Sequence, residues 1–284
     1  MNKYTGLLCL SLLPTLLLGA CGGSGGDGAS DVDNQNSSEQ NQPREGAADL
    51  VKNYIKPASL VVNSDVEHYQ IAMVGNSHSS GLAPTLKHAI ETMSPDKTVN
   101  VEVLGFGFTD NLIGDYEVVK RFTQPDTPWT HLIIQGQKYS QSMSKYYSTE
   151  ATRQWVAMAK THGATPILFP EHPQRGNTVE GGYVHGIHKS IAAAEPSCLA
   201  PIAKAWYGTI ASRPELTLHA ADGNHADSLG ILLSSLVFTQ IITGQSVDKG
   251  STSIVAGVSP ELQGELAQHA AQAIAEQPAC PENI

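Results

Sequence analysis

Basic residues are scarce in this chain. Its 284 residues hold 17 lysines and arginines against 27 aspartates and glutamates, which gives a formal net charge of −10. Proteins that bind nucleic acid need a basic face to neutralise phosphates, so the composition excludes nucleic acid as an expected partner. Internal repeats are also missing from the sequence. The 40% of apolar residues suits one sizeable folded domain.

Long apolar runs are missing beyond the N-terminus. The one run covers Leu7 to Leu18 and follows Lys3. A short positive region, a short apolar core and small residues before a cleavage point are typical of a secretory signal. The segment Leu18-Gly19-Ala20-Cys21 resembles a bacterial lipobox, in which the cysteine is lipidated and becomes the first mature residue. We therefore expect a lipoprotein signal peptide over residues 1–20 and lipidation of Cys21, with an ordinary signal peptide cut nearby as the alternative.

A lipidated Cys21 would anchor the protein to the bacterial cell envelope, because two or more acyl chains hold a protein firmly to a membrane. Gly22 follows, where an Asp would favour the inner membrane, so we expect the outer membrane if the cell is Gram-negative. Residues 21–46 are almost free of apolar side chains and cannot offset the entropy cost of ordering. They are expected to form a flexible tether, followed by a folded domain over residues 47–284.

Cysteines are few as well, at four in the chain. Cys9 lies in the signal and Cys21 is expected to carry lipid, which leaves Cys198 and Cys280 in the folded part. Export places this pair where disulfides persist, so we expect a bond between them. No spacing in the sequence forces their contact, and two unpaired thiols remain the alternative.

Segments of strand length alternate with amphipathic helices along the folded part. Strands are expected at 69–74, 99–104, 129–134 and 165–169, with a short apolar piece at 199–202. Helices are expected at 47–55, 82–93, 111–122, 149–162, 183–194, 203–212, 227–244 and from Ser259-Pro260 onward. This alternation predicts an α/β fold: a three-layer α/β/α sandwich around a mainly parallel sheet. Ligands of such sheets bind beyond the carboxyl ends of the strands.

A serine stands at the end of the first expected strand. The apolar run Ile71 to Val74 leads into Gly75-Asn76-Ser77, and Leu82 opens an amphipathic helix. Near a helix N-terminus, unpaired N–H groups and the helix dipole favour a developing negative charge. Ser77 is therefore a candidate nucleophile, and a helix-capping role is the alternative.

A base for this nucleophile is found near the C-terminus. The segment Asp222-Gly223-Asn224-His225 precedes the long apolar helix expected at 227–244. A carboxylate three residues before a histidine can orient its imidazole, and the ring can then take a proton from a hydroxyl. Ser77, His225 and Asp222 thus form a candidate triad.

With these blocks the chain resembles the SGNH, or GDSL-type, hydrolases over about residues 69–244. In that superfamily a Gly-Asp-Ser block follows the first strand, and an Asp-x-x-His near the C-terminus completes the triad. Gly75-Asn76-Ser77 and Asp222 to His225 are the matching segments here. The resemblance implies a serine esterase that forms an acyl-enzyme and needs no cofactor. It also implies that the backbone N–H groups of Ser77 and Gly105 receive the oxyanion, with Gly107 as the alternative to Gly105.

The third expected oxyanion donor lies where the sequence departs from the family. Members carry Gly-x-Asn-Asp after the third strand, whereas this chain has Gln135-Gly136-Gln137-Lys138. If Gln135 stands for the Gly of that block, Gln137 takes the Asn position, and its side-chain amide can donate in the same way. The resemblance therefore implies Gln137 as the third donor.

Several histidines have two interpretations. His78 beside the nucleophile either faces the cleft or is solvated, and His219 is expected to be structural. His172, His185 and His188 suggest a metal, but such a site needs three or four ligands and supporting contacts, so we expect no metal.

Taken together, the sequence predicts an exported ester hydrolase that acts on acyl esters, short-chain or acetyl, of a small molecule or polysaccharide. An O-acyltransferase with the same triad and a catalytically silent carbohydrate-binding lipoprotein are the alternatives. The altered Gln135–Gln137 block is the only support for the silent protein. The sequence leaves the oligomeric state open.

Overall fold

A computed structural model describes residues 46–136, 139, 143–246 and 254–281, which belong to the compact unit Arg44–Ile284. The segment expected to be a signal peptide, Cys21 and nearly all of the expected tether lie outside the described residues, as does Gln137. Within the described ranges, no helix combines the length and the apolar character needed to cross a membrane.

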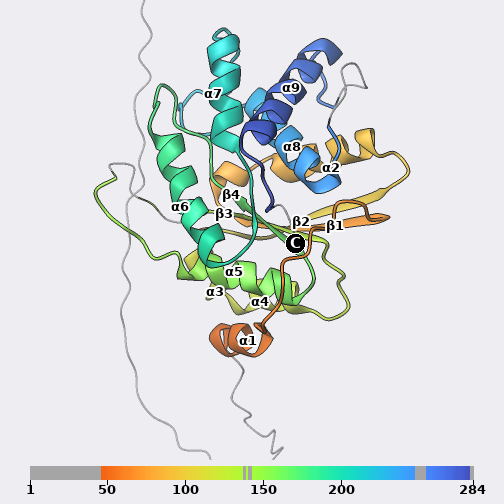
Figure 1. Cartoon of the computed structure of the whole chain (residues 1–284), viewed down its shortest axis with the longest axis vertical. Coiled ribbons are helices and arrows are strands. Elements are labelled where there is room, and N and C mark those ends of the chain that lie inside the picture. Colours follow the sequence, from red (N-terminus) through yellow and green to blue (C-terminus); the bar gives the residue numbers. More distant parts are fainter. Residues whose placement is uncertain (1–45, 137–138, 140–142, 247–253, 282–284) are drawn as a thin grey trace, which may run out of the picture. The chain divides into compact units, whose positions relative to one another are not determined.

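The centre of the described unit is a five-stranded sheet in the order β2-β1-β3-β4-β5, with each neighbouring pair parallel (Figure 1). Its strands are β1 (His68–Gly75), β2 (Thr98–Phe106), β3 (His131–Gln135), β4 (Thr165–Phe169) and β5 (Cys198–Leu199). The chain builds outward from β1 to β2 on one side and then through β3, β4 and β5 on the other. The strand order therefore reverses between β1 and β3, which is where ligands bind in open α/β sheets.

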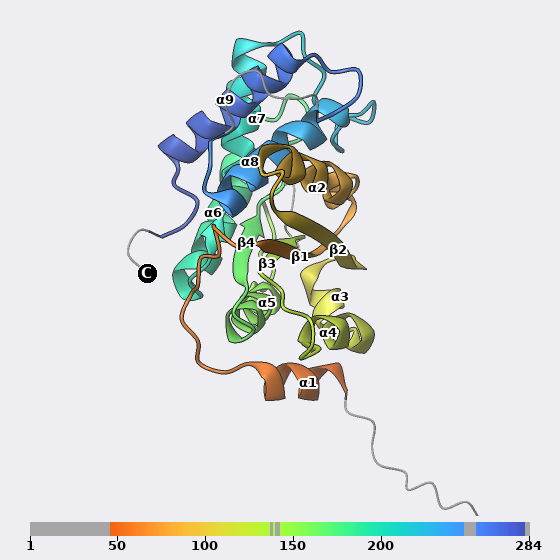
Figure 2. The same ribbon diagram turned by 90° about the vertical axis from the view of Figure 1, so that its right-hand side faces the viewer.

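Helices cover both faces of the sheet (Figure 2). One face carries α2 (Leu82–Met93), α7 (Ile202–Ser212), α8 (Ser228–Thr243) and α9 (Pro260–Glu276). The other carries α1 (Ala47–Tyr54), α3 (Thr109–Ile113), α4 (Tyr116–Thr123), α5 (Glu150–Thr161) and α6 (Glu180–Ala194). The predicted three-layer α/β/α sandwich with a parallel sheet is confirmed.

The alternation of side chains along β1 explains why its central part, Ile71 to Val74, is apolar at every position. Ile71 and Met73 pack into the core beneath α2, α7, α8 and α9, while Ala72 and Val74 pack into the core on the opposite face. Successive residues of a strand point to opposite faces, so a strand covered on both sides needs an apolar residue at every position.

The helix expected over 111–122 is two helices in the structure. α3 ends at Ile113, and the Asp115 side chain accepts hydrogen bonds from the backbone N–H groups of Glu117 and Val118 at the start of α4. An aspartate in this N-cap position begins a new helix, because it satisfies N–H groups that have no partner within the helix. At α9 the expected capping is present: the Ser259 side chain accepts from Leu262 N–H, and Pro260 is the first helical residue.

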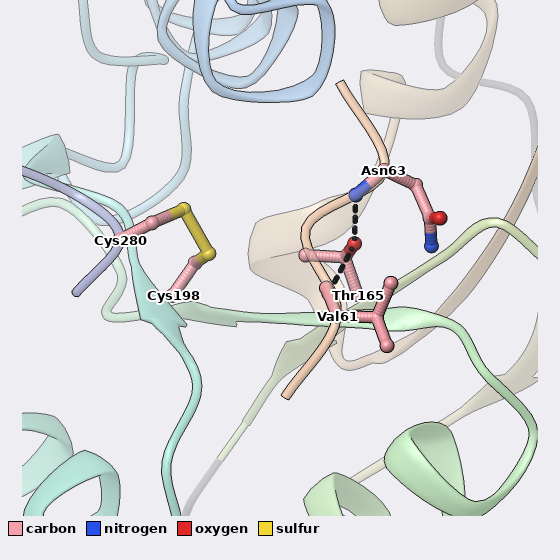
Figure 3. Close-up of a disulfide and its surroundings, with 5 residues drawn as sticks. All are labelled: Val61, Asn63, Thr165, Cys198 and Cys280. Carbon is pink, nitrogen blue, oxygen red and sulfur yellow. Dashed lines mark hydrogen bonds between the residues drawn. A yellow bond between two sulfur atoms is a disulfide. The ribbon is translucent and has the colours of Figure 1, made fainter. Parts of the chain in front are cut away.

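The expected disulfide joins Cys198 at the start of β5 to Cys280, beyond the end of α9 (Figure 3). Beside it, Leu199 N–H donates to the Ala279 carbonyl oxygen at 2.6 Å. These links fix the segment after α9 to the edge of the sheet. Figure 3 also shows Thr165 Oγ1 between Asn63 N–H and the Val61 carbonyl oxygen, which attaches the chain before β1 to the start of β4.

Candidate active site

Ser77 lies on a short 3-10 turn, η1 (Ser77–Ser79), directly after β1. The Asn76 side chain accepts a hydrogen bond from His78 N–H at 3.0 Å, and the Asn76 carbonyl oxygen accepts from the Ser79 hydroxyl at 2.7 Å. The serine is on the turn between strand and helix, as the sequence predicts. However, α2 begins only at Leu82, after Gly81 with a φ of 75°, so Ser77 is not in the first turn of that helix.

Ser77, His225 and Asp222 are joined by consecutive hydrogen bonds. His225 Nε2 lies 2.9 Å from Ser77 Oγ, and His225 Nδ1 lies 2.5 Å from Asp222 Oδ2. The bond from the imidazole, together with the backbone N–H groups of Asn224 and His225, holds the pKa of the Asp222 carboxyl well below its usual range. An ionised Asp222 retains the proton on Nδ1, which leaves Nε2 free to accept the proton of Ser77.

The loop that carries Asp222 and His225 runs between α7 and α8 and is held from both sides. Ala220 N–H donates to the His225 carbonyl oxygen at 2.8 Å, and Gly223 adopts a φ of 72°, a conformation that favours glycine. Arg175 donates to the carbonyl oxygens of His219 and Ala220 at 3.1 and 2.6 Å. The distance between the carboxylate and the imidazole is thus set by backbone contacts, not by the side chains alone.

A pocket of about 770 Å³ opens beside the nucleophile. Polar and aromatic side chains dominate its lining, which consists of Asn76, Ser77, His78, Phe106, Gly107, Phe108, Asn111, Tyr139, Tyr147, Glu171 and Asn224. These residues come from the end of β2, from α3, from the segments that follow β1, β2, β3 and β4, and from the loop before α8. They meet at the carboxyl ends of the strands, as the predicted topology requires.

The expected oxyanion donors differ in their hydrogen-bond partners and in their position relative to the pocket. Ser77 N–H has no acceptor within the described residues. Gly105 pairs with Val74 in the sheet, and a Cβ atom there would lie 2.8 Å from the Leu112 side chain. Gly107 does line the pocket, but its N–H donates to the Gly75 carbonyl oxygen at 2.8 Å. Gln137 lies outside the described residues.

Gln135 has a role that the sequence did not indicate. Its fully buried amide accepts a hydrogen bond from Asn76 N–H at 2.7 Å and donates one to Glu171 Oε2 at 2.6 Å. A Cβ atom at Gly75 would lie 2.7 Å from the Gln135 amide oxygen, so this approach requires glycine. A glutamine directly after the buried apolar run Leu132 to Ile134 was the available signal.

Glu171 is a second residue of the pocket that the sequence did not indicate. Its carboxyl is buried, lines the pocket and contacts the Tyr139 hydroxyl. Burial raises the pKa of Glu171 to about 7. The Tyr139 hydroxyl in turn donates to Glu180 Oε1 at 2.9 Å, and Glu180 Oε2 accepts from Gln174 N–H at 2.7 Å.

His78 faces the pocket, the first of its two expected placements. Its ring stacks on His225 and meets the edge of His172, both at 5.2 Å between centroids. His172 in turn stacks on Trp206 at 3.9 Å. Burial lowers the pKa of His78 to about 4 and that of His172 to about 3, so both rings are neutral at pH 7.

The remaining histidines do not gather into a metal site. His219 Nε2 lies 2.8 Å from the Pro173 carbonyl oxygen, a structural contact. His185 and His188 lie on α6, and the described part of the chain contains no group of three or more His, Cys, Asp or Glu side chains placed to hold a metal ion.

Comparison with solved structures finds chains that are similar to this one. A DUF4886 family protein from Bacteroides uniformis aligns with a TM-score of 0.54 at 14% identity, over 74% of this chain and 96% of that one. A protein from Slackia heliotrinireducens described as an SGNH hydrolase aligns with a TM-score of 0.49 at 19% identity, over 61% and 98% of the two chains. For a protein from Parabacteroides merdae described as a GDSL-like lipase, the TM-score is 0.46 at 11% identity, over 66% and 99%.

These identities are low, and the likeness is therefore one of fold. The chain matches no protein-family profile and no curated protein sequence. Its parallel sheet in the order β2-β1-β3-β4-β5 places a serine after β1 and an Asp-x-x-His segment before α8. The comparison with a TM-score above 0.5 shows that the chain shares the fold of the DUF4886 family protein from Bacteroides uniformis.

Proposed function

We propose that this protein is a serine ester hydrolase that cleaves acyl esters. The observation that carries the proposal is the unbroken series of hydrogen bonds from Asp222 through His225 to Ser77, at the edge of a polar pocket. A carboxylate, an imidazole and a hydroxyl in this series are what convert serine into a nucleophile near neutral pH.

In the proposed reaction, Ser77 Oγ attacks the acyl carbon while His225 Nε2 takes the hydroxyl proton. Asp222 stabilises the imidazolium that forms. His225 then gives the proton to the oxygen of the departing alcohol, the ester C–O bond breaks, and an acyl-enzyme remains on Ser77. Water attacks the acyl carbon with His225 as the base, which releases the carboxylic acid and restores the serine.

The negative charge of the tetrahedral intermediate needs hydrogen-bond donors. The Ser77 N–H is the first of these in our proposal, because no described residue accepts from it. The Gly105 N–H and the Gln137 side-chain amide are the second and third, on the family resemblance. The reaction as written requires no cofactor.

The expected substrates are acetyl or other short-chain esters, including those on carbohydrates, and the pocket of about 770 Å³ falls in the range of small-molecule sites. We further propose that the enzyme acts at the cell envelope, anchored through lipid on Cys21. The proposed location rests on the sequence of the N-terminus. The proposed substrate class rests on that location and on the family resemblance.

A fluorophosphonate probe tests the proposed function, because it reacts only with an activated serine. We expect the full chain to gain the mass of one phosphonyl group on the peptide that contains Ser77, and the Ser77→Ala variant to gain none. A protein that folds but remains unlabelled would be the silent binding protein. Product that forms only when a sugar acceptor is added, without release of free acid, would identify an acyltransferase.

A further inference from the structure

The pocket contains a second carboxyl group, on Glu171, which the triad does not use. Glu171 follows β4 and is 6% exposed, and it lines the same pocket as Ser77. Its Oε2 accepts from Gln135 Nε2 at 2.6 Å. The amide cannot be turned round, because its oxygen accepts from Asn76 N–H. Gln135 therefore presents a donor to Glu171, and Glu171 presents acceptors to the pocket.

The side chains around Glu171 offer more hydrogen-bond acceptors than they have protons to donate. The Tyr139 hydroxyl lies between two carboxyl groups, Glu171 and Glu180, and it has one proton to donate. When Tyr139 donates to Glu180, its oxygen can only accept from Glu171, and Glu171 must then hold a proton. When Glu171 is ionised, the two carboxylates compete for one hydroxyl. The Glu171 carboxyl is thus held in a state that can both accept and donate a hydrogen bond.

The pocket side of Glu171 lacks a full set of partners. A carboxyl group has about four lone-pair positions, and within the described residues Gln135 and Tyr139 are the hydrogen-bonding neighbours of this one. Buried polar groups are rarely left unpaired, because desolvation without a hydrogen bond is costly. In the apo protein, water can fill these positions; in the complex, a substrate group that both donates and accepts would fill them.

A hydroxyl group has this double capacity. Asn111 and Asn224 line the same pocket with amide groups, and Tyr147 adds an aromatic ring. We propose that Glu171 is a specificity-determining residue that binds a free hydroxyl of the substrate, so that the site takes acyl esters of polyhydroxylated compounds such as partly acetylated sugars. The inference rests on the proposed function insofar as it takes the substrate to be an acyl ester. The binding of a hydroxyl by Glu171 does not depend on that function.

Equilibrium binding to the Ser77→Ala protein tests the inference without any turnover. The probes are a methyl xyloside with one O-acetyl group and two free hydroxyls, and the same glycoside fully acetylated. The measured quantity is the ratio of the two dissociation constants, from calorimetry or ligand-observed NMR. We expect the Ser77→Ala protein to prefer the mono-acetylated probe. Adding Glu171→Gln should reduce this preference about tenfold, because the amide oxygen would accept from Gln135 and the remaining NH2 group can donate to the substrate hydroxyl but not accept from it.

Glu117→Gln is the matched control, since Glu117 is exposed on α4 and lies outside the pocket lining. Added to Ser77→Ala, it should leave the preference unchanged. The ratio is taken on one preparation, so a reduced folded fraction cancels. Glu171→Asp, which withdraws the carboxyl by one methylene, replaces Glu171→Gln if that variant does not fold, and it should lose the preference in the same way.

The outcomes separate this inference from the proposed function. An equal preference with and without the Glu171 carboxyl would overturn the inference, as would the absence of any preference in the Ser77→Ala protein. Stronger binding of acetylcholine than of either glycoside would also overturn it, because the site would then select positive charge. Preference that depends on Glu171 in a protein that fluorophosphonate does not label would keep the hydroxyl site and remove the hydrolase.

Discussion

The side-chain oxygen of Gln135 lies 2.7 Å from the backbone nitrogen of Asn76, and this hydrogen bond connects the end of β3 to the loop that carries Ser77. The amide is fully buried, and its other end donates to Glu171. The block after β3 differs from the family pattern in sequence. Its first glutamine nevertheless supports the nucleophile loop directly, which explains why a polar residue ends a buried strand.

Variants at the two glutamines of this block should have different effects. Gln135→Ala should lower the free energy of unfolding by about 2 kcal/mol or more, because it removes the acceptor of Asn76 N–H and one of the two donors near Glu171, and opens a cavity. Gln137→Ala should lower kcat about 100-fold with little loss of stability, as the removal of an oxyanion donor does. Urea unfolding and ester kinetics on both variants measure the two effects. A silent Gln137→Ala, beside a Gln135→Ala variant that is stable but slow, would contradict the assignment of Gln137.

Triad variants test the nucleophile and its base. Ser77→Ala should lower ester hydrolysis by roughly 10³-fold or more, His225→Ala by a similar factor and Asp222→Ala by less. The reason is that the first two supply the attacking oxygen and its proton acceptor, whereas Asp222 acts through His225. Turnover of p-nitrophenyl acetate measures the effect, with Ser80→Ala as the control at an exposed position in the same loop. Wild-type turnover by Ser77→Ala would remove Ser77 from the mechanism.

Those parts of the site that depend on a local sequence pattern could be predicted from the sequence. An apolar strand, a turn with Ser77 and an amphipathic helix are contiguous in the chain, and so are Asp222 and His225, which bond at a spacing of three residues. The alternation of largely apolar strands with amphipathic helices was enough to predict a parallel sheet. Its topology then brought the serine and the histidine to the same edge.

The parts that depend on contacts between distant segments could not be predicted. Glu171 becomes notable only because Gln135, at the end of β3, and Tyr139, in the loop after it, both contact its carboxyl. His78 is half-buried and packs against His172 and His225, from two further loops, and no local pattern distinguishes this from a solvated ring. The break between α3 and α4 was readable in principle from Asp115, but the apolar periodicity continues across it and favoured a single helix.

Acid should destabilise the protein through its buried neutral histidines, and His188 offers the cleanest test. Burial lowers the pKa of His188 from its ordinary value of 6.5 to about 4, and its Nε2 has no hydrogen-bond partner within the described residues. Below pH 6.5 the unfolded chain binds a proton that the native ring does not bind until about pH 4. The native state is therefore favoured above pH 6.5, and this stability is lost as the pH falls towards 4.

His188→Leu should remove this pH-dependent contribution to the free energy of unfolding. The loss of unfolding free energy between pH 7.5 and pH 5 should be about 2 kcal/mol smaller in the variant than in the wild type. Urea unfolding at the two pH values measures it, and His88→Leu, at an exposed position of α2, is the matched control. Glu171 contributes in the opposite direction, because its raised pKa penalises the native state as the pH rises from about 4.5 to about 7. An unchanged difference in His188→Leu would show that this ring is not held neutral.

Reduction of the Cys198–Cys280 bond should loosen the C-terminal segment before it affects the triad. The bond spans 82 residues of sequence, for which chain-entropy estimates give about 4.5 kcal/mol at most. It fixes the segment after α9 to β5, whereas Ser77, His225 and Asp222 are held by the loops described above. We expect a Cys198→Ala/Cys280→Ala variant to melt at a lower temperature and to keep most of its ester turnover at 25 °C. Thermal unfolding with and without reductant, with the double variant as the control that should not respond to reductant, measures the effect. A melting temperature that reductant leaves unchanged in the wild type, together with two free thiols in the exported protein, would contradict the bond.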